Sequence, residues 1–205
     1  DCINQLKQTD INGCITGSSM IGENFDEWDQ APDIDLFVYK REQLLYASDL
    51  AIMTMGFEPK SEGEKTKLKW MRDGSFNKKM PVSTVKLVKD GVELNISHKN
   101  YRSGLLEVLA SFDMSIIMIG YDIQRHITLD LRCGWDGMVP LDEEDRWSSN
   151  TKIAVPNPLR LIESSVFSTA SAVRQFDRVV KYWNRGFDTR PMARFYIELI
   201  DKVMK

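Results

Sequence analysis

The stretches GSSMIG at residues 17–22 and DIDLFV at residues 33–38 decide the interpretation of this chain of 205 residues. In the second stretch apolar residues alternate with Asp33 and Asp35, a period-two pattern that predicts a β-strand. Side chains two apart leave the same face of a strand, so the two carboxylates are placed to bind divalent cations together. By itself, such a pair can equally mark the solvent-exposed face of an amphipathic strand.

The upstream stretch supplies the context that favours a functional site. It follows a short predicted strand at residues 13–15 and opens as a tight turn at Gly17, Ser18 and Ser19. Backbone amides and hydroxyls at such a helix start can hold phosphate oxygens. A glycine-serine turn alone is a weak signal. Before an Asp-apolar-Asp strand, it favours a site for a phosphorylated ligand and its metal ions.

Glycine-serine after a short strand, a link, and Asp-apolar-Asp opening the next strand resemble the signature of the DNA polymerase β nucleotidyltransferase superfamily. The resemblance implies that Asp33 and Asp35 hold two magnesium ions while an NMP passes from an NTP to an acceptor hydroxyl. It also implies that Gly17, Ser18 and Ser19 cradle the β- and γ-phosphates of the NTP.

The superfamily usually adds a third carboxylate from a later strand, and the stretch GVELNI at residues 91–96 resembles that strand. Its Val-Glu-Leu pattern is similar to that of CCA-adding enzymes and bacterial poly(A) polymerases, which implies that Glu93 is the third metal ligand. Many relatives have aspartate at the position of Asn95, which shares a strand face with Glu93. If Asn95 fills the third position, we expect impaired or absent activity, because a neutral amide cannot act as a general base.

Two further segments resemble the CCA-adding class. FDMSI at residues 112–116 is similar to its Arg-Asp-Phe-Thr-Ile segment, which implies that Asp113 positions the nucleotide. NPLRL at residues 157–161 is similar to the start of its neck helix, which implies that Arg160 meets the triphosphate. The alternatives are a core strand for the first segment, and for the second a capped helix whose arginine lies in solvent.

The remaining pattern predicts an α/β fold of the α+β kind, with a mixed sheet covered by helices on one face. We expect a nucleotidyltransferase head over residues 1–140 and a helical C-terminal part over residues 141–205. Apolar residues at helical spacing predict helices over residues 41–55, from about 159 to 183, and from about 191 to 204. Later strands are predicted at residues 66–70, 84–88, 92–96 and 127–131, and residues 114–121 form either a strand or a buried helix.

Lys65, Lys67 and Lys69 alternate along the predicted strand at residues 66–70. Such a stripe could face phosphates, although it more often lies on a solvated surface. His98 and His126 are the only histidines, and neither has a partner at a spacing that indicates a ligand or a base.

Composition limits the partners of the protein. A net charge of -3 excludes the global basic field that drives non-specific nucleic-acid binding, so any RNA contact must be local. No apolar run approaches the roughly 20 residues of a membrane-spanning helix, and the three cysteines are widely spaced. We therefore expect a cytoplasmic protein with no membrane contact. By analogy the acceptor is an RNA or tRNA 3′ end, with a protein or a small molecule left open.

Two rival interpretations stay open at this point. The first is a catalytically impaired module of the same fold that binds a nucleotide or a protein partner, which Asn95 motivates. The second is a phosphate-binding fold unrelated to this superfamily, which would show no linked binding of metal and NTP.

Overall fold

The computed structural model describes residues 2–22, 33–74, 83–99, 104–112, 114–131, 169–184 and 189–203. They belong to two compact units, one of Asp1–Leu109 with Ile119–Leu129 and one of Ala110–Met118 with Asp130–Lys205. The elements follow in the order α1 (Cys2–Lys7), β1 (Gly13–Thr16), α2 (Ser18–Gly22), β2 (Asp33–Val38), α3 (Glu42–Met55), β3 (Glu58–Pro59), α4 (Glu62–Arg72), β4 (Thr84–Lys89), β5 (Val92–His98), α5 (Leu105–Ala110), η1 (Ser115–Ile117), β6 (Ile119–Asp122), β7 (Ile127–Asp130), α7 (Thr169–Trp183) and α8 (Arg190–Val203).

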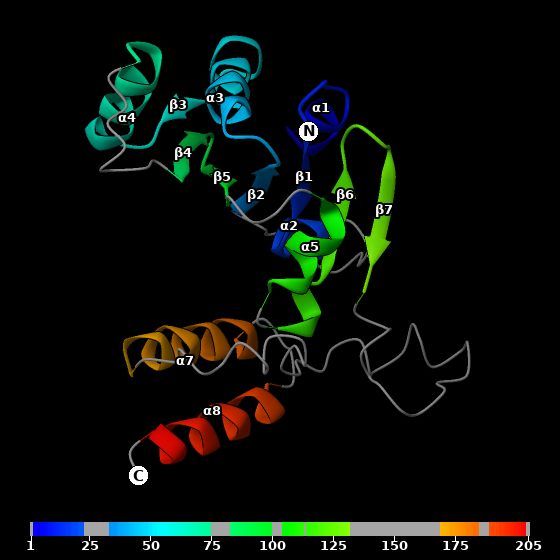
Figure 1. The fold of residues 1–205 in the computed structure, drawn as a ribbon, viewed down its shortest axis with the longest axis vertical. Helices are drawn as coiled ribbons and strands as arrows, with labels where there is room; N and C mark the ends of the chain where they lie inside the picture. Colours follow the sequence, from blue (N-terminus) through cyan, green and yellow to red (C-terminus); the bar gives the residue numbers. More distant parts are fainter. Residues whose placement is uncertain are drawn as a thin grey trace. The chain divides into compact units, whose positions relative to one another are not determined.

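Within the described residues, the strands form one seven-stranded sheet in the order β3-β4-β5-β2-β1-β6-β7. Strand β2 lies at its centre, parallel to β5 and antiparallel to β1 (Figure 1). Strand β1 also pairs antiparallel with β6, and β4 pairs antiparallel with β3 and β5. This mixed sheet with its helices confirms the predicted α+β class and is consistent with a nucleotidyltransferase head domain.

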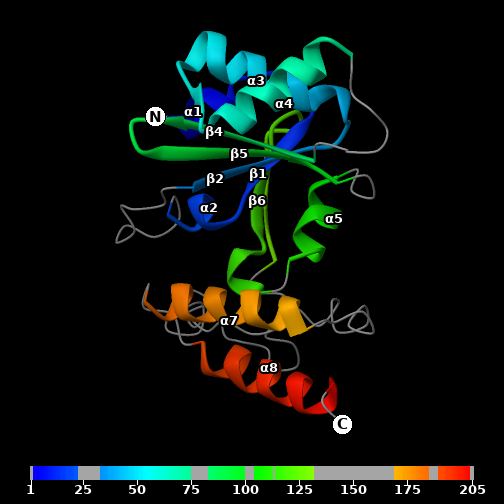
Figure 2. The same ribbon diagram turned by 90° about the vertical axis from the view of Figure 1, so that its left-hand side faces the viewer.

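One face of the sheet is apolar and forms the core of the first unit. Helix α3 contacts β4 and β5, and α4 contacts β3, β4 and α3, so both helices cover one side of the sheet (Figure 2). The side chains that alternate inward along the central strands are almost completely buried: Ile34, Leu36, Val85, Leu87, Leu94 and Ile96. Because side chains alternate between faces, the polar residues of β2 and β5 leave the other face. Helix α2, which contacts β1, β2 and β6, lies on that second side (Figure 2).

Helix α3 confirms the helix predicted over residues 41–55. It ends at Gly56, whose φ of 75° lies in the left-handed region that glycine adopts without steric cost. The amide of Phe57 then donates to the carbonyl of Ala51 over 3.1 Å, which satisfies a carbonyl of the last turn. This stop turns the chain toward β3 at the edge of the sheet.

The strand predicted at residues 66–70 is wrong, because these residues lie in helix α4. Ser61 caps the helix, and its hydroxyl oxygen accepts a hydrogen bond from the amide of Glu64 over 3.3 Å. Serine followed three residues later by glutamate is typical of a helix start. That signal was stronger than the alternation of lysines.

The lysines of α4 consequently do not form a stripe along a strand. Lys65 pairs with Glu62 over 2.6 Å and Lys67 pairs with Glu64 over 2.7 Å, each within the helix. The buried Glu64 carboxylate also accepts from the backbone amide of Lys86 over 3.1 Å. Lys67 donates to the carbonyl of Thr84 over 3.4 Å, so side chains of α4 bond to backbone groups of β4.

For residues 114–121 the sequence left a strand and a buried helix open, and the structure contains both a short helix and a strand there. Residues Ser115–Ile117 form a short 3-10 helix, and Ile119–Asp122 form strand β6. In the second unit α7 and α8 pack against each other around buried side chains of Val179, Tyr182, Met192 and Tyr196. The predicted helix from about residue 159 is confirmed from Thr169 onward, and its earlier part lies outside the described residues.

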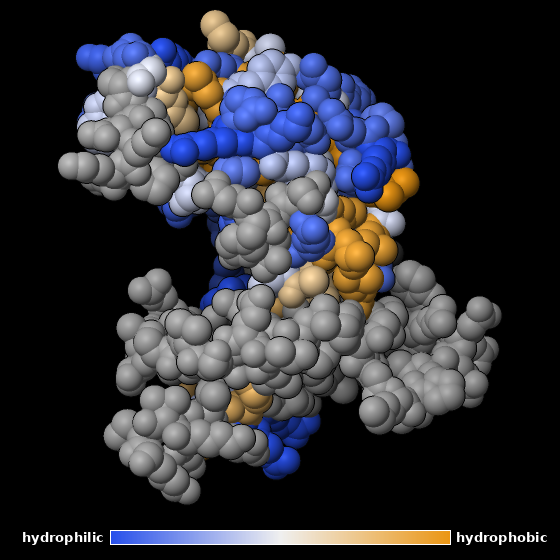
Figure 3. All heavy atoms as spheres, viewed as in Figure 1, coloured by the Kyte–Doolittle hydropathy of each residue, from blue (hydrophilic) through white to orange (hydrophobic). Residues whose placement is uncertain are grey.

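Hydrophilic side chains dominate the surface of the first unit over α1 and α3, whereas apolar side chains gather over α5 and β7 (Figure 3). Leu106 of α5 and Ile127 of β7 are among the exposed large apolar residues. Among the described helices, none combines the length and the apolar character needed to cross a membrane.

Candidate functional site

The predicted carboxylates lie on the polar face of the sheet, where β2 and β5 run in parallel. Asp33 is the register partner of Glu93, and Asp35 is the register partner of Asn95. Partners in a sheet share a face, so the four side chains form two adjacent rows. All four residues are partly buried. The sheet therefore gathers residues from two segments about 60 positions apart in the sequence.

The glycine-serine turn meets this face at Asp35. Thr16, the last residue of β1, pairs with Asp35 in the antiparallel ladder, and Gly17 follows with a φ of 80°. A Cβ atom at Gly17 would lie 2.5 Å from Oδ2 of Asp35, closer than non-bonded atoms approach. Only glycine fits both this backbone angle and this contact. The structure thus places the turn against the second aspartate of the Asp-apolar-Asp strand.

The two serines of the turn begin the short helix α2. Ser18 is 4% exposed and Ser19 is 3% exposed. The hydroxyl of Ser19 donates to the carbonyl of Thr16 over 3.2 Å, and the amide of Met20 donates to the carbonyl of Gly17 over 3.2 Å. The Ser19 hydroxyl is therefore used inside the turn. Contacts from this turn to a phosphate would come mainly from backbone amides.

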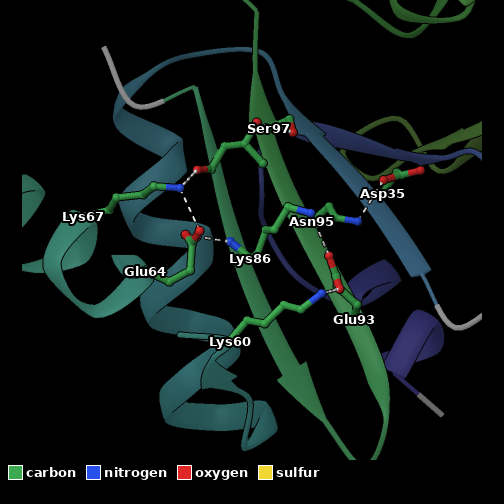
Figure 4. A network of polar contacts seen from close by, with 9 residues as sticks. Asp35, Lys60, Glu64, Lys67, Lys86, Glu93, Asn95 and Ser97 are labelled. Carbon is green, nitrogen blue, oxygen red and sulfur yellow. Dashed lines mark hydrogen bonds and ion pairs between the residues drawn. The ribbon is translucent and has the colours of Figure 1, made fainter. Parts of the chain in front are cut away.

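Asn95 contacts Asp35 directly. Its side-chain Nδ2 donates to Oδ1 of Asp35 over 3.3 Å (Figure 4). The other amide atom, Oδ1 of Asn95, is buried and has no hydrogen-bond partner within the described part of the chain. Among the described residues, the hydroxyl of Thr16, which is 0% exposed, is the other buried side-chain oxygen without a hydrogen-bond partner. Both oxygens belong to register partners of Asp35, one in each neighbouring strand.

Glu93 is engaged by two lysines that the sequence did not single out. Lys60 bonds to Oε2 of Glu93, and Lys86 bonds to Oε1 over 3.0 Å (Figure 4). The Glu93 side chain is 15% exposed, whereas those of Lys60 and Lys86 are 48% and 47% exposed. Burial raises the pKa of Glu93, but the two lysine hydrogen bonds outweigh it and hold the pKa below its usual 4.5. Glu93 is therefore a stable carboxylate with both oxygens in ion pairs.

Lys60 also lies within electrostatic reach of Asp33. The hydrogen bond to Glu93 is the largest cause of the raised pKa of Lys60, and the charge of Asp33 contributes to it. Across residues 2–22, 33–74, 83–99 and the later described segments, no group of three or more His, Cys, Asp or Glu side chains is arranged to hold a metal ion.

A second polar cluster lies farther along the same sheet, between β1, β2 and β6. The Tyr39 hydroxyl donates to Oδ2 of Asp122 over 2.9 Å, and Cys14 is the register partner of Asp122. Burial raises the pKa of the Cys14 thiol to about 12, against a smaller lowering by its hydrogen bond to Tyr39. A thiol that stays protonated is a poor nucleophile, so we assign this cluster to packing.

Two predicted site residues, Asp113 and Arg160, lie outside the described residues, as does the acidic stretch at residues 23–30. Their roles stay predictions. Sequence reasoning missed Lys60, Lys86 and Thr16. Lys86 alternates with buried residues in β4, and this pattern could have placed it on the polar face. The positions of Lys60 and Thr16 depend on strand pairing, which no local pattern indicates.

Solved structures similar to this chain are tRNA-processing enzymes. The Thermotoga maritima CCA-adding enzyme complexed with tRNA_CCA matches with a TM-score of 0.55 and 14% identity, covering 98% of this chain and 42% of that chain. A tRNA-processing enzyme with CTP matches with a TM-score of 0.52 and 14% identity, covering 97% of this chain and 45% of that one. A tRNA nucleotidyltransferase complexed with a primer tRNA and an incoming ATP analog matches with a TM-score of 0.50 and 13% identity, covering 94% and 47%.

At this identity the likeness shows the fold alone, which is a nucleotidyltransferase-like fold. The chain spans less than half the length of each of these proteins. No protein-family model matches the sequence. No curated protein matches it either.

Proposed function

We propose that this protein is a magnesium-dependent nucleotidyltransferase that moves an NMP from an NTP to an acceptor hydroxyl. The observation that carries the proposal is the contact of the Gly17 turn with the Asp35 carboxylate on the polar face of the sheet. A turn suited to phosphate and a strand suited to metal ions serve one reaction only if they lie together. The nucleotidyltransferase-like fold supports the same reaction.

The donor groups fit hard divalent cations. Asp33 and Asp35 present carboxylates from one face of β2, and the buried oxygens of Asn95 and Thr16 lie in the adjacent strands. Oxygen donors of this kind suit magnesium. Glu93 is less suited to join them, because each of its oxygens already bonds to a lysine whose positive charge would repel a metal ion.

In the proposed reaction Asp33 and Asp35 bind two magnesium ions, and the backbone of Gly17, Ser18 and Ser19 holds the β- and γ-phosphates. When bound, the ions supply charge that stabilises the attacking and leaving oxygens of an in-line displacement at the α-phosphate. The positive φ of Gly17 keeps the turn close to Asp35, which aligns triphosphate and carboxylates before reaction. We propose that Asp113 and Arg160 position the nucleotide.

We propose an RNA or tRNA 3′ end as the acceptor. The similar structures include complexes with tRNA, which supports this acceptor class.

A second candidate function is an inactive module of the same fold that binds a nucleotide or a protein partner. Two observations favour it: a neutral Asn95 is the β5 neighbour of Asp35, and lysines already neutralise Glu93. In this alternative the lysines replace metal ions as the counter-charges of the cluster.

The experiment incubates the protein with each α-labelled NTP, magnesium and either total RNA or total protein, and separates the labelled products on a gel. We compare wild type with Asp35→Asn. Asp90→Asn is the matched control, because Asp90 lies in the β4–β5 turn with a φ of 49° that asparagine also tolerates. Label on RNA that is lost only in Asp35→Asn supports the proposal. Label on protein or a small molecule moves the acceptor to that class, and NTP binding without labelled product supports the inactive module.

A further inference from the structure

We infer that Asn95, and not Glu93, is the β5 residue that completes the cation site at Asp35, with its amide oxygen as the ligand. The inference rests on the proposed function, because it concerns the metal that the proposed reaction uses. An amide can bind a cation but cannot act as a general base, so we expect slow transfer from a site completed by Asn95. Glu93 is the register partner of Asp33, whereas Asn95 is the register partner of Asp35. Asn95 therefore lies beside the carboxylate that contacts the Gly17 turn.

The distance between Asn95 and Asp35 suits two ligands of one ion. Nδ2 of Asn95 lies 3.3 Å from Oδ1 of Asp35. Neighbouring ligands of octahedral magnesium, with bonds of about 2.0–2.1 Å at right angles, are roughly 3 Å apart. Because the amide nitrogen and oxygen have nearly the same shape, a half-turn of the amide places Oδ1 where Nδ2 now lies. A small adjustment then provides two oxygens at coordination spacing.

The half-turn breaks one hydrogen bond only. Oδ1 of Asn95 has no partner within the described residues, so its rotation costs no further contact. Thr16 is fully buried and lies in β1, on the side of Asp35 opposite to Asn95. Its hydroxyl also has no hydrogen-bond partner among the described residues. Buried polar groups are normally paired, so two such oxygens flanking one carboxylate point to a ligand at that place.

Glu93 is the poorer ligand for a physical reason. A metal ion at Glu93 would lie close to the ammonium groups of Lys60 and Lys86, which already bond to both oxygens of a carboxylate that is only 15% exposed. Repulsion between these like charges disfavours metal binding there. Coordination by Asn95 also lowers the charge of the ligand set, because an amide is neutral. We therefore expect weaker metal binding than three carboxylates provide, and tighter binding when the amide becomes a carboxylate.

The test is a titration of the full chain with Mn2+ alone, followed by electron paramagnetic resonance of the free ion. Asn95→Ala is expected to weaken Mn2+ binding at least about tenfold, the loss that even outer partners of metal ligands cause. Asn95→Asp is expected to tighten binding, and Glu93→Gln to leave it within about twofold. Ser97→Ala is the matched control on the same strand face, because Ser97 contacts Thr84 at 3.0 Å and not Asp35. Weaker binding in Glu93→Gln with unchanged binding in Asn95→Ala would overturn the inference.

A second measurement guards against misfolded variants. In Asn95→Asp two carboxylates lie side by side without metal and repel each other, so Mn2+ should raise its melting temperature more than that of wild type. An equal or smaller rise contradicts the inference. The proposed function can fail while this inference holds. If Mn2+ binding depends on Asp35 and Asn95 but no NTP is turned over, the proposed enzyme activity is wrong and the proposed metal site stands. Absence of Asp35-dependent Mn2+ binding overturns both.

Discussion

At the scale of the single residue, Gly17 links the fold to the proposed chemistry through one backbone angle. Its φ of 80° turns the chain from β1 into α2, and its missing side chain leaves room for the Asp35 carboxylate. A methyl group in this position meets a carboxylate oxygen at 2.5 Å, so either the turn or the aspartate must move. Both movements separate the turn that we propose to bind phosphate from the strand that we propose to bind metal ions.

Gly17→Ala is therefore expected to abolish nucleotide transfer and to destabilise the protein by more than the backbone cost alone. The left-handed conformation costs a non-glycine residue about 1–2 kcal/mol. Gly91→Ala is the matched control, since Gly91 has a φ of 81° and a Cβ atom added there would meet nothing within 4 Å. Gly91→Ala should lose only the folding free energy that the left-handed backbone costs, and it should keep transfer activity. Urea unfolding and the labelling assay measure the two effects, and equal behaviour of the two variants would contradict the role given to Gly17.

The Glu93 ion pairs give a second prediction at this scale, a pH dependence of stability. Lysine hydrogen bonds hold the folded pKa of Glu93 below its usual 4.5, even though burial raises it. A depressed carboxyl pKa stabilises the folded state at pH values above the unfolded pKa, and this stability is lost as the pH falls through the folded pKa. Glu93→Gln should therefore destabilise the protein at pH 7 and much less at pH 3.

Urea unfolding of both proteins at the two pH values checks this expectation. Glu62→Gln is the control, because Glu62 forms an exposed pair with Lys65 and such pairs contribute little. A Glu93→Gln difference that is equally large at both pH values would show that the carboxylate charge is not what stabilises the fold.

At the scale of the element, α4 depends on the residue that caps it. The Ser61 hydroxyl accepts from the Glu64 amide, and α4 in turn holds the edge of β4 through Glu64 and Lys67. Ser61→Ala is expected to lower the free energy of unfolding by about 1 kcal/mol, the usual value of a lost N-cap. Ser61→Asp keeps an accepting oxygen and should stay close to wild type. Denaturant unfolding decides between them, and a Ser61→Asp loss as large as that of alanine would argue against capping.

Local sequence patterns predicted most helices and strands correctly where only one pattern was present in a segment. The alternation around Asp33 and Asp35 predicted β2, and apolar spacing with Gly56 predicted α3. Residues 66–70 carried two conflicting signals, alternating lysines and the Ser61 to Glu64 cap. The cap prevailed, because helical lysines can pair with glutamates one turn away and α4 also satisfies the edge of β4.

At the scale of the whole molecule, strand pairing decides what the candidate site contains. The sequence predicted Asp33, Asp35 and a polar face on β5, but the parallel register that sets Asn95 beside Asp35 depends on tertiary structure. The same holds for Lys60, which follows the edge strand β3 and reaches Glu93 on β5. Local sequence patterns do not indicate which strands pair, so the lysine partners of Glu93 could not be predicted.

The chain is shorter than the similar tRNA enzymes. It spans less than half the length of each, so an RNA acceptor is a proposal for this protein. The described residues that carry the proposal all belong to the first unit, which contains the complete seven-stranded sheet apart from the end of β7.

The position of phosphate attack is tested by comparing NTP labelled on the α-phosphate with NTP labelled on the γ-phosphate, in the presence of magnesium and RNA. Attack at the α-phosphate predicts that the α-label appears on the acceptor and the γ-label leaves as pyrophosphate, with both signals lost in Asp35→Asn and kept in Asp90→Asn. Transfer of the γ-label to an acceptor, or α-labelling that persists in Asp35→Asn, would contradict a nucleotidyltransferase centred on Asp35.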